Sequence, residues 1–176
     1  EAVAKSYPDI ETEHMLVDAF SQSVIRKPET FDVVVASNMF GDIITEVASV
    51  VQGGMGMAAG CNIGDDHAMF EPIHGSAPNM AGKESCNPIA MFLALAEAVR
   101  WVGNRKSLLK AAVAANVIEN AVASVIAQGE TLTYDIKEQP AAGTFDVAKA
   151  VADAILQADL TGKSLTDNKL TGEQGE

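Results

Sequence analysis

Two acidic side chains, Asp42 and Glu46, lie four residues apart in the stretch "NMFGDIITEVASVVQGGMGMAAGCNIG", residues 38–64. On a helix this spacing places both carboxylates on one face, one turn apart, where they repel each other by roughly 0.2 to 0.5 kcal/mol. A bound divalent cation would reverse that repulsion, because Mg²⁺ takes carboxylate oxygens and keeps further positions for water or substrate. The same pair also fits two solvated acids at a helix start, where negative charge is favoured. Spacing alone leaves both interpretations open.

A second group of polar side chains occupies "FEPIHGSAPNMAGKESCNPIAMF", residues 70–92. Its members are Glu71, His74, Ser76, Asn79 and Asn87. Such a Gly- and Pro-rich loop can wrap a planar base and offer backbone N–H groups to it. A lone His in a loop is also a common surface residue, so the role of His74 stays open. The nearby "GGMGMAAG" lacks the pattern G-x-G-x-x-G and follows a helix, so it is interpreted as a helix stop and a turn.

Helices are predicted to alternate with short strands along the chain. Hydrophobic periodicity and turn residues predict helices over 12–26, 42–51, 88–102, 106–127 and 144–158, the last with Thr144 as its N-cap. Strands are expected over 31–36, 68–72 and 131–136, and the remainder of 53–87 reads mostly as loop. This alternation indicates an α/β protein with a mixed or parallel sheet. The polar, Gly-rich residues 159–176 are expected to form a mobile tail.

Composition narrows the class of partner. The 176 residues carry a net charge of −12 without a run of Lys or Arg, so nucleic acid is not expected as a partner. Apolar stretches such as 89–102 contain charges and fall short of the ~20 residues that a bilayer demands, so no membrane is expected. Cys61 and Cys86 lack CxxC spacing, which favours a reduced, cytoplasmic setting over a zinc site or a disulfide. The opening "EAVAKSYPDI" reads as entered mid-helix, which favours a fragment, a processed chain or a split subunit.

Several stretches resemble, in order, the β-decarboxylating dehydrogenases, the family of isopropylmalate and isocitrate dehydrogenases. They are "YPDIETEHMLVDAF", "FDVVVASNMFGDIITE", "GGMGMAAGCNIG" and "FEPIHGSAPNMAGK". The resemblance runs from Glu1 to about Ala158 and covers about the C-terminal half of a family member. It implies the family's three-layer α/β fold with only that half present. It assigns 1–53 to a substrate and dimerisation domain and 54–158 to a cofactor-binding domain, with 159–176 outside it.

The resemblance also implies a metal site and a reaction. Family members oxidise a 2-hydroxy acid with NAD or NADP and decarboxylate it with the help of Mg²⁺ or Mn²⁺. The metal-binding and catalytic acids then fall on Asp42 and on Asp18 in "LVDAF", with Glu46 as a further ligand; Asp18 reaches across the interface of a homodimer. Where Glu46 stands the family usually has Asp. The extra methylene shifts the carboxylate by about 1.5 Å, so weaker metal binding is a hypothesis.

A cofactor loop is implied as well, at Glu71, His74, Gly75, Ser76, Ala77, Pro78, Asn79 and Asn87. NAD-using members commonly carry Asp at the position of Asn79 and NADP-using members carry Lys, so Asn79 matches neither. Tyr134 resembles the NADP type, but Glu138 stands where that type brings Arg to the 2′-phosphate, and an acid there disfavours phosphate. NAD is therefore expected. The family's substrate-binding arginines and its catalytic Tyr and Lys would all precede Glu1, so a non-catalytic truncated or regulatory, dimer-forming subunit is the alternative.

Overall fold

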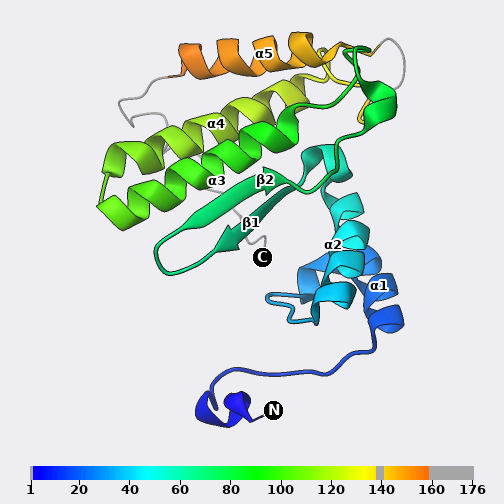
Figure 1. Ribbon diagram of the computed structural model, residues 1–176, viewed down its shortest axis with the longest axis vertical. Coiled ribbons are helices and arrows are strands. Elements are labelled where there is room, and N and C mark those ends of the chain that lie inside the picture. The colour runs from blue at the N-terminus through cyan, green and yellow to red at the C-terminus, as the bar shows by residue number, and fades with distance from the viewer. Residues whose placement is uncertain (1, 138–140, 159–176) are drawn as a thin grey trace, which may run out of the picture. The chain divides into compact units, whose positions relative to one another are not determined.

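The computed structural model describes residues 2–137 and 141–158, and the chain divides between Gln52 and Gly53 into two compact units (Figure 1). Its helices and strands are α1 (Val17–Arg26), α2 (Asn38–Gln52), β1 (Ala59–Ile63), β2 (Ala68–Pro72), α3 (Ile89–Lys106), α4 (Leu109–Gln128) and α5 (Thr144–Gln157). Short 3-10 helices span Val3–Ser6, Pro28–Thr30, Met55–Met57 and Pro78–Met80. The assignment of the two parts to substrate and cofactor domains stays a prediction, and the predicted tail and Glu138 lie outside the described residues.

The first unit is built on the packing of α1 against α2. Phe20 and Val24 from α1 meet Ile44 from α2 in a small buried core. The ring of Phe31 packs edge-on against Phe20, with 4.9 Å between the centroids. An aromatic pair of this geometry adds about 0.5 to 1.5 kcal/mol beyond the area it buries. This contact holds the connection between the two helices against their core.

Both helices of this unit differ from the predicted bounds. The first begins at Val17 instead of residue 12, because Leu16 is already extended and residues before it have no helical hydrogen bonds. The second begins at Asn38, four residues before the predicted start, and Gly41 N–H donates to the carbonyl of Ser37 at 2.7 Å. It ends at Gln52, where Gly53 takes a φ of 112° that other residues rarely adopt.

The predicted strands over 31–36 and 131–136 are wrong for this chain. Val33 and Val35 are 86% and 92% exposed, and the described residues provide no strand for them to pair with. A strand is stabilised by backbone bonds to a neighbour, and without one the segment stays irregular. At 131–136 the chain turns instead, because the N–H groups of Ile136 and Lys137 both donate to the carbonyl of Thr133. The predicted mixed or parallel sheet is likewise not found among the described residues, whose sheet has two antiparallel strands.

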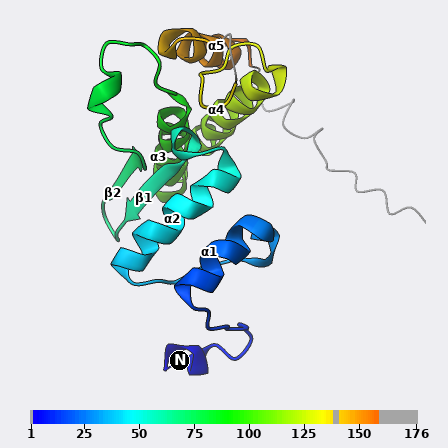
Figure 2. The same cartoon turned by 90° about the vertical axis from the view of Figure 1, so that its right-hand side faces the viewer.

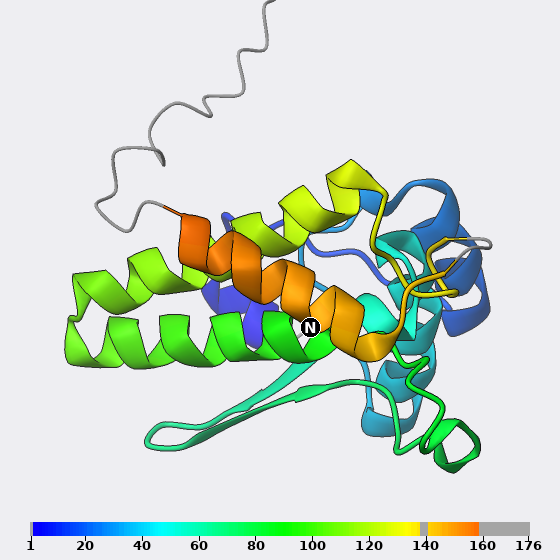
Figure 3. The same cartoon turned by 90° about the horizontal axis from the view of Figure 1, so that it is seen from above.

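The second unit stacks a β-hairpin and three helices. The predicted strand over 68–72 is confirmed as β2, and it pairs with the unpredicted β1 in a register that sets Cys61 opposite Phe70. Figures 1 and 2 show the hairpin along α3, with α4 packed on α3. Figure 3 shows α5 crossing over the helical pair, and it packs on α4.

Arg105, near the end of α3, fastens the hairpin to that helix. Its guanidinium donates to the carbonyl of Asp65 and, at 3.2 Å, to the carboxylate of Asp66, both in the hairpin turn. It also lies over the ring of Trp101 at 5.0 Å, and that ring packs edge-on against Phe70 of β2. Stacking and bidentate donation are both particular to Arg. The hairpin is thus held at its turn as well as along its length.

Helices α3 and α4 confirm the predicted helices over 88–102 and 106–127, with Gly129 in the left-handed conformation after α4. The second of them is long and apolar enough, by length and composition, to cross a membrane. That signal is weak, because a core helix passes the same test. Six of its side chains are buried, and the helix packs on both α3 and α5.

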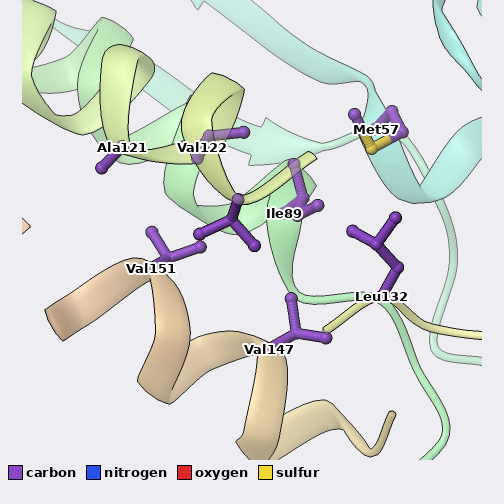
Figure 4. Packing of buried hydrophobic residues seen from close by; sticks show 8 residues of the cluster. Met57, Ile89, Ala121, Val122, Leu132, Val147 and Val151 are labelled. Carbon is purple, nitrogen blue, oxygen red and sulfur yellow. The ribbon is translucent and has the colours of Figure 1, made fainter. Parts of the chain in front are cut away.

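One hydrophobic cluster joins the 3-10 helix Met55–Met57, α3, α4, the turn at 131–137 and α5 (Figure 4). Its buried members are Met57, Ile89, Ala121, Val122, Val125, Leu132, Val147 and Val151. The helix predicted over 144–158 is confirmed as α5, but Thr144 is not its N-cap: Gly143 occupies that position. Thr144 is the first helical residue, and its hydroxyl donates to the carbonyl of Cys86 at 2.6 Å.

We expect Ile89→Ala to destabilise the second unit by about 2 to 5 kcal/mol, because Ile89 is fully buried and its loss leaves a cavity. Met91→Ala is the matched control on the same helix, 59% exposed, and should change the free energy of unfolding by less than about 0.5 kcal/mol. Urea unfolding measures both. Equal effects of the two substitutions would contradict the packing described.

Candidate functional site

Asp42 and Glu46 both lie exposed on α2, while Ile44 between them is buried against α1. Asn38, one turn earlier, donates from Nδ2 to Asp42 Oδ2 at 3.2 Å. Because α2 begins at Asn38, the first turn holds no acid, and both carboxylates lie beyond the reach of the positive helix end. The explanation of the pair as acids favoured at a helix start therefore loses its physical basis.

Asp18 does occupy the first turn of a helix, α1. Its Oδ1 accepts a hydrogen bond from the N–H of Ala19 at 2.8 Å. Within residues 2–137 and 141–158, no three or more His, Cys, Asp or Glu side chains gather as a metal site. One chain as described thus does not bring Asp18 together with Asp42 and Glu46. The expectation that Asp18 comes from a partner chain stays a prediction.

The predicted cofactor loop leaves the end of β2. Glu71 is exposed in that strand, opposite Gly60. His74 donates from Nδ1 to the carbonyl of Gly75 at 2.9 Å, which requires the proton on Nδ1. Gly75 and Ser76 follow, exposed, and Ala77 takes a φ of 43° and ψ of 59°. This left-handed conformation costs a non-glycine residue about 1 kcal/mol or more, and such strain gathers at ligand sites.

The short 3-10 helix Pro78–Met80 carries Pro78 and the exposed Asn79. Met80 anchors this 3-10 helix, because its Sδ accepts hydrogen bonds from the thiol of Cys86 and from the hydroxyl of Tyr134, each at 3.9 Å. The sulfur contacts are individually weak. They nevertheless tie the helix that presents Asn79 to the turn at 131–137.

Thr144 makes a stronger tie at the other end of the loop. Its N–H donates to the carbonyl of Glu84 at 2.7 Å, and its hydroxyl donates to the carbonyl of Cys86 at 2.6 Å. Both acceptors are backbone atoms in a stretch without a regular element, where Glu84 also has a positive φ of 48°. Each such bond contributes about 1 kcal/mol net. The start of α5 therefore fixes the path of the loop into α3.

Asn87 lies at the end of the loop, and hydrogen bonds at both of its side-chain polar atoms orient it. Its Nδ2 donates to Asp135 Oδ2 at 3.0 Å and faces Met57 Sδ at 3.6 Å, and its Oδ1 accepts from Ile89 N–H at 3.0 Å. Gly56 lies against this pair: a Cβ there would stand 2.7 Å from Asp135 Oδ2 and 2.9 Å from Asn87 Cβ. Three segments distant in the sequence thus converge on one amide.

Sequence reasoning missed Gly56, Asp135 and the bonding role of Thr144. It treated the glycines of "GGMGMAAG" as a turn and "TLTYDI" as a strand, and it gave Thr144 a local capping role. The signal for Gly56 was the cluster of glycines itself. Nothing in the sequence indicates which side chain needs the missing Cβ, because the contact joins residues 56, 87 and 135.

Two other polar features serve the scaffold. Arg100 donates to Asn116 Oδ1 at 2.7 Å and pairs with Glu119 at 2.5 Å, and that hydrogen bond raises the pKa of the Arg100 guanidinium. Partial burial, and then the charge of Glu97, raises the pKa of the Cys61 thiol, which makes it a poorer nucleophile at neutral pH. Cys61 and Cys86 are both free thiols.

An open hollow of about 470 Å³ lies beside α5, and no residue of the predicted cofactor loop lines it. It is lined by Glu130, Thr131, Ala141, Ala142, Asp146, Lys149, Ala150 and Asp153. The cation in this lining, Lys149, is paired with Asp153 at 2.5 Å. Asp146 accepts from the N–H of Gly143 at 3.1 Å. These groups stabilise α5 and leave little to recognise a substrate.

Comparison with known proteins identifies the family. The family model for isocitrate/isopropylmalate dehydrogenase matches residues 1–154. The chain is 42% identical over 153 residues to a 3-isopropylmalate/3-methylmalate dehydrogenase of Methanocaldococcus jannaschii, which covers 87% of this chain and 43% of the relative. It is 40% identical over 136 residues to an NADP isocitrate dehydrogenase of Thermus thermophilus, covering 77% of this chain and 26% of the relative.

Solved structures agree with this. The crystal structure of isocitrate dehydrogenase from Methylococcus capsulatus matches with a TM-score of 0.80 and 40% identity, over 89% of this chain and 44% of that one. A β-decarboxylating dehydrogenase from Thermococcus kodakarensis in the apo form matches with a TM-score of 0.70 and 32% identity, over 88% and 43%. The chain belongs to the isocitrate/isopropylmalate dehydrogenase family and spans less than half the length of these relatives. The predicted family fold, present in part, is confirmed.

Because Gly56 faces Asn87 and Asp135 with no room for a methyl group, we expect Gly56→Ala to lower the free energy of unfolding by about 1 to 3 kcal/mol. Gly75→Ala is the matched control in the predicted cofactor loop, since a Cβ there meets nothing within 4 Å. Thermal unfolding compares the two variants. A Gly56→Ala protein as stable as the control would show that the three segments do not meet as described.

Proposed function

We propose that this chain supplies the metal-binding acids and the cofactor loop of a metal-dependent, NAD-linked oxidative decarboxylase. Its substrate would be a 2-hydroxy acid of the 3-isopropylmalate or isocitrate type. The observation that carries the proposal is that Asp42 and Glu46 are both exposed on one face of α2. Neither acid lies in the first turn of that helix, so the positive helix end does not account for them. The membership of the family and the ordered cofactor loop support it.

The donor set of α2 fits a divalent cation. Among the described residues neither Asp42 nor Glu46 is in an ion pair, so both carboxylates offer oxygens to Mg²⁺ or Mn²⁺. When bound, the cation would supply Lewis-acid stabilisation of negative charge on the substrate oxygens. Asn38 donates to Asp42 Oδ2, which orients that carboxylate and leaves Oδ1 for the ion.

Asp18 completes the set in the proposal, contributed by the second chain of a homodimer. It is exposed in the first turn of α1, where only one of its oxygens accepts a backbone hydrogen bond.

We infer a cytoplasmic enzyme, since both cysteines are free thiols.

The cofactor preference in this proposal is NAD over NADP. Asn79 stands exposed on the 3-10 helix Pro78–Met80, and a neutral amide there can bond ribose hydroxyls but brings no positive charge to a 2′-phosphate. The net charge of −12 adds a further penalty for the extra phosphate. NADP binding as tight as NAD binding would overturn this preference.

The second candidate function is a non-catalytic, dimer-forming subunit. The observation that favours it is Glu46, whose longer side chain departs from the expected Asp. Mg²⁺ demands near-ideal octahedral geometry, so a displaced carboxylate weakens the site. A regulatory chain would tolerate that loss, whereas an active enzyme needs the ion held firmly.

Mn²⁺ titration of the ¹⁵N-labelled chain tests the metal site. Paramagnetic broadening should appear first at the amides of Asp42 and Glu46, and Asp42→Asn should weaken it at least about tenfold. Glu46→Asp should strengthen it, because the shorter acid restores the expected geometry. Asp32→Asn, an exposed acid in the same unit, is the control and should change nothing. Paramagnetic broadening that is unchanged by Asp42→Asn would contradict the proposed metal site.

The 176-residue chain alone should not oxidise isocitrate or 3-isopropylmalate, because the family's substrate-binding arginines and its catalytic Tyr and Lys, by the resemblance, would all precede Glu1. Absorbance at the NADH wavelength, with Mn²⁺ and NAD present, measures this. Turnover above the rate of an Asp42→Asn control would show that these residues suffice, and the expectation that further catalytic residues are needed would be wrong.

A further inference from the structure

The loop after β2 contains two non-glycine residues with a left-handed backbone, Ala77 and Glu84, whose φ angles are 43° and 48°. A residue with a Cβ keeps this conformation only where surrounding contacts outweigh its cost. Gly82, which lies between them, has a φ of 73° without such a cost. The segment by itself would therefore not favour this path, and contacts from outside the loop must hold it.

The first residue of α5 provides such contacts at the end of the loop. The N–H of Thr144 donates to the carbonyl of Glu84 at 2.7 Å, and its hydroxyl donates to the carbonyl of Cys86 at 2.6 Å. Gly143, just before α5, lies equally near, since a Cβ there would stand 3.3 Å from the carbonyl oxygen of Glu84. The hydroxyl bond is partly buried, so water replaces it poorly. Both bonds together hold the peptide groups that follow residues 84 and 86.

Residues 84–86 connect the two ends of the proposed nucleotide site. Asn87 follows them directly, with its side chain oriented by its own hydrogen bonds. In the other direction, the thiol of Cys86 donates to Met80 Sδ at 3.9 Å, in the 3-10 helix that carries Asn79. A shift of the backbone at 84–86 therefore disturbs Asn79 and Asn87 together.

We infer that Thr144 is a positioning residue of the nucleotide site, whose hydroxyl holds residues 84–86 in the path that presents Asn79 and Asn87 together. This inference rests on the proposed role of residues 71–87 in cofactor binding. Thr144 acts through the carbonyl of Cys86 and touches no ligand itself. Without the hydroxyl, that half-buried carbonyl loses its donor and Glu84 can relax to an ordinary φ. The binding-competent path is then populated only in part, and the apparent affinity falls with its population.

Thr144→Val tests the inference, because valine keeps the shape of threonine and removes the hydroxyl, while the backbone N–H still donates to Glu84. Titration of the folded, ¹⁵N-labelled chain with NAD gives the dissociation constant, which a loss of global stability alone does not change. We expect Thr144→Val to weaken NAD binding about three- to tenfold, and Thr144→Ser, which keeps the hydroxyl, to weaken it less than about twofold.

The outcomes distinguish the inference from the proposed function. NAD binding that Thr144→Val leaves unchanged, or that Thr144→Ser weakens equally, would overturn the inference while the proposed cofactor site stands. NAD that shifts no amide at 71–87 of the unsubstituted chain would overturn both.

Glu84→Gly, added to Thr144→Val, tests whether backbone strain is the cause. Glycine adopts a φ of 48° without the cost of a Cβ, so the double variant should recover most of the lost NAD affinity. Glu84→Gln in the same background is the matched control: it removes the same negative charge, keeps the Cβ and should recover none. Recovery with both substitutions, or with neither, would overturn the part that strain at Glu84 plays.

Discussion

The second unit depends on the hydrogen bonds that join the loop after β2 to the turn at 131–137 and to the first residue of α5. The loop has little regular structure between Ile73 and Pro88, so it must be held from outside. Thr144 donates hydrogen bonds to the carbonyls of Glu84 and Cys86, and the carboxylate of Asp135 accepts one from the side-chain amide of Asn87. These are polar bonds at the rim of a core in which Leu132 and Val147 lie buried. Burial of the core brings the two segments together, and the hydrogen bonds then fix the path of the loop.

In the first unit, helix packing rather than a hydrogen-bonded loop positions the candidate site residues. Its acids stand on a helix whose opposite side is packed through Ile44 and Val47 against α1, so a buried core positions the backbone that carries Asp42 and Glu46. A metal site gains from such positioning, because carboxylates that must be gathered at the moment of binding lose side-chain entropy. The loop and the acid pair thus belong to separate units, each ordered by its own core. In the proposed enzyme, the first unit binds the metal ion and the second unit binds the nucleotide cofactor.

Helices proved more predictable from this sequence than strands. The periodic apolar residues of α3, α4 and α5 carry their own signal, and each helix forms close to where it was expected. The run of valines at 33–35 has the composition of a buried strand, but a strand also needs a partner, and the described chain offers none there. Composition alone could not reveal that. Conversely, β1 lies in glycine-rich sequence and exists because β2 pairs with it.

The candidate site was predictable to the extent that it rests on contiguous residues. The acids of α2 and the loop from Glu71 to Asn87 stand in single stretches of sequence, so a resemblance could point to them. Asp135 and Gly56 matter only through contacts across the fold, and Asp135 is 48 positions along the chain from its partner Asn87. Hydrogen exchange with and without NAD tests most directly whether this assembled loop is a cofactor site. The account predicts slower exchange at 71–87 and 131–137 together, with α1 unchanged. Slower exchange that spares both of these segments, or no change anywhere, would contradict it.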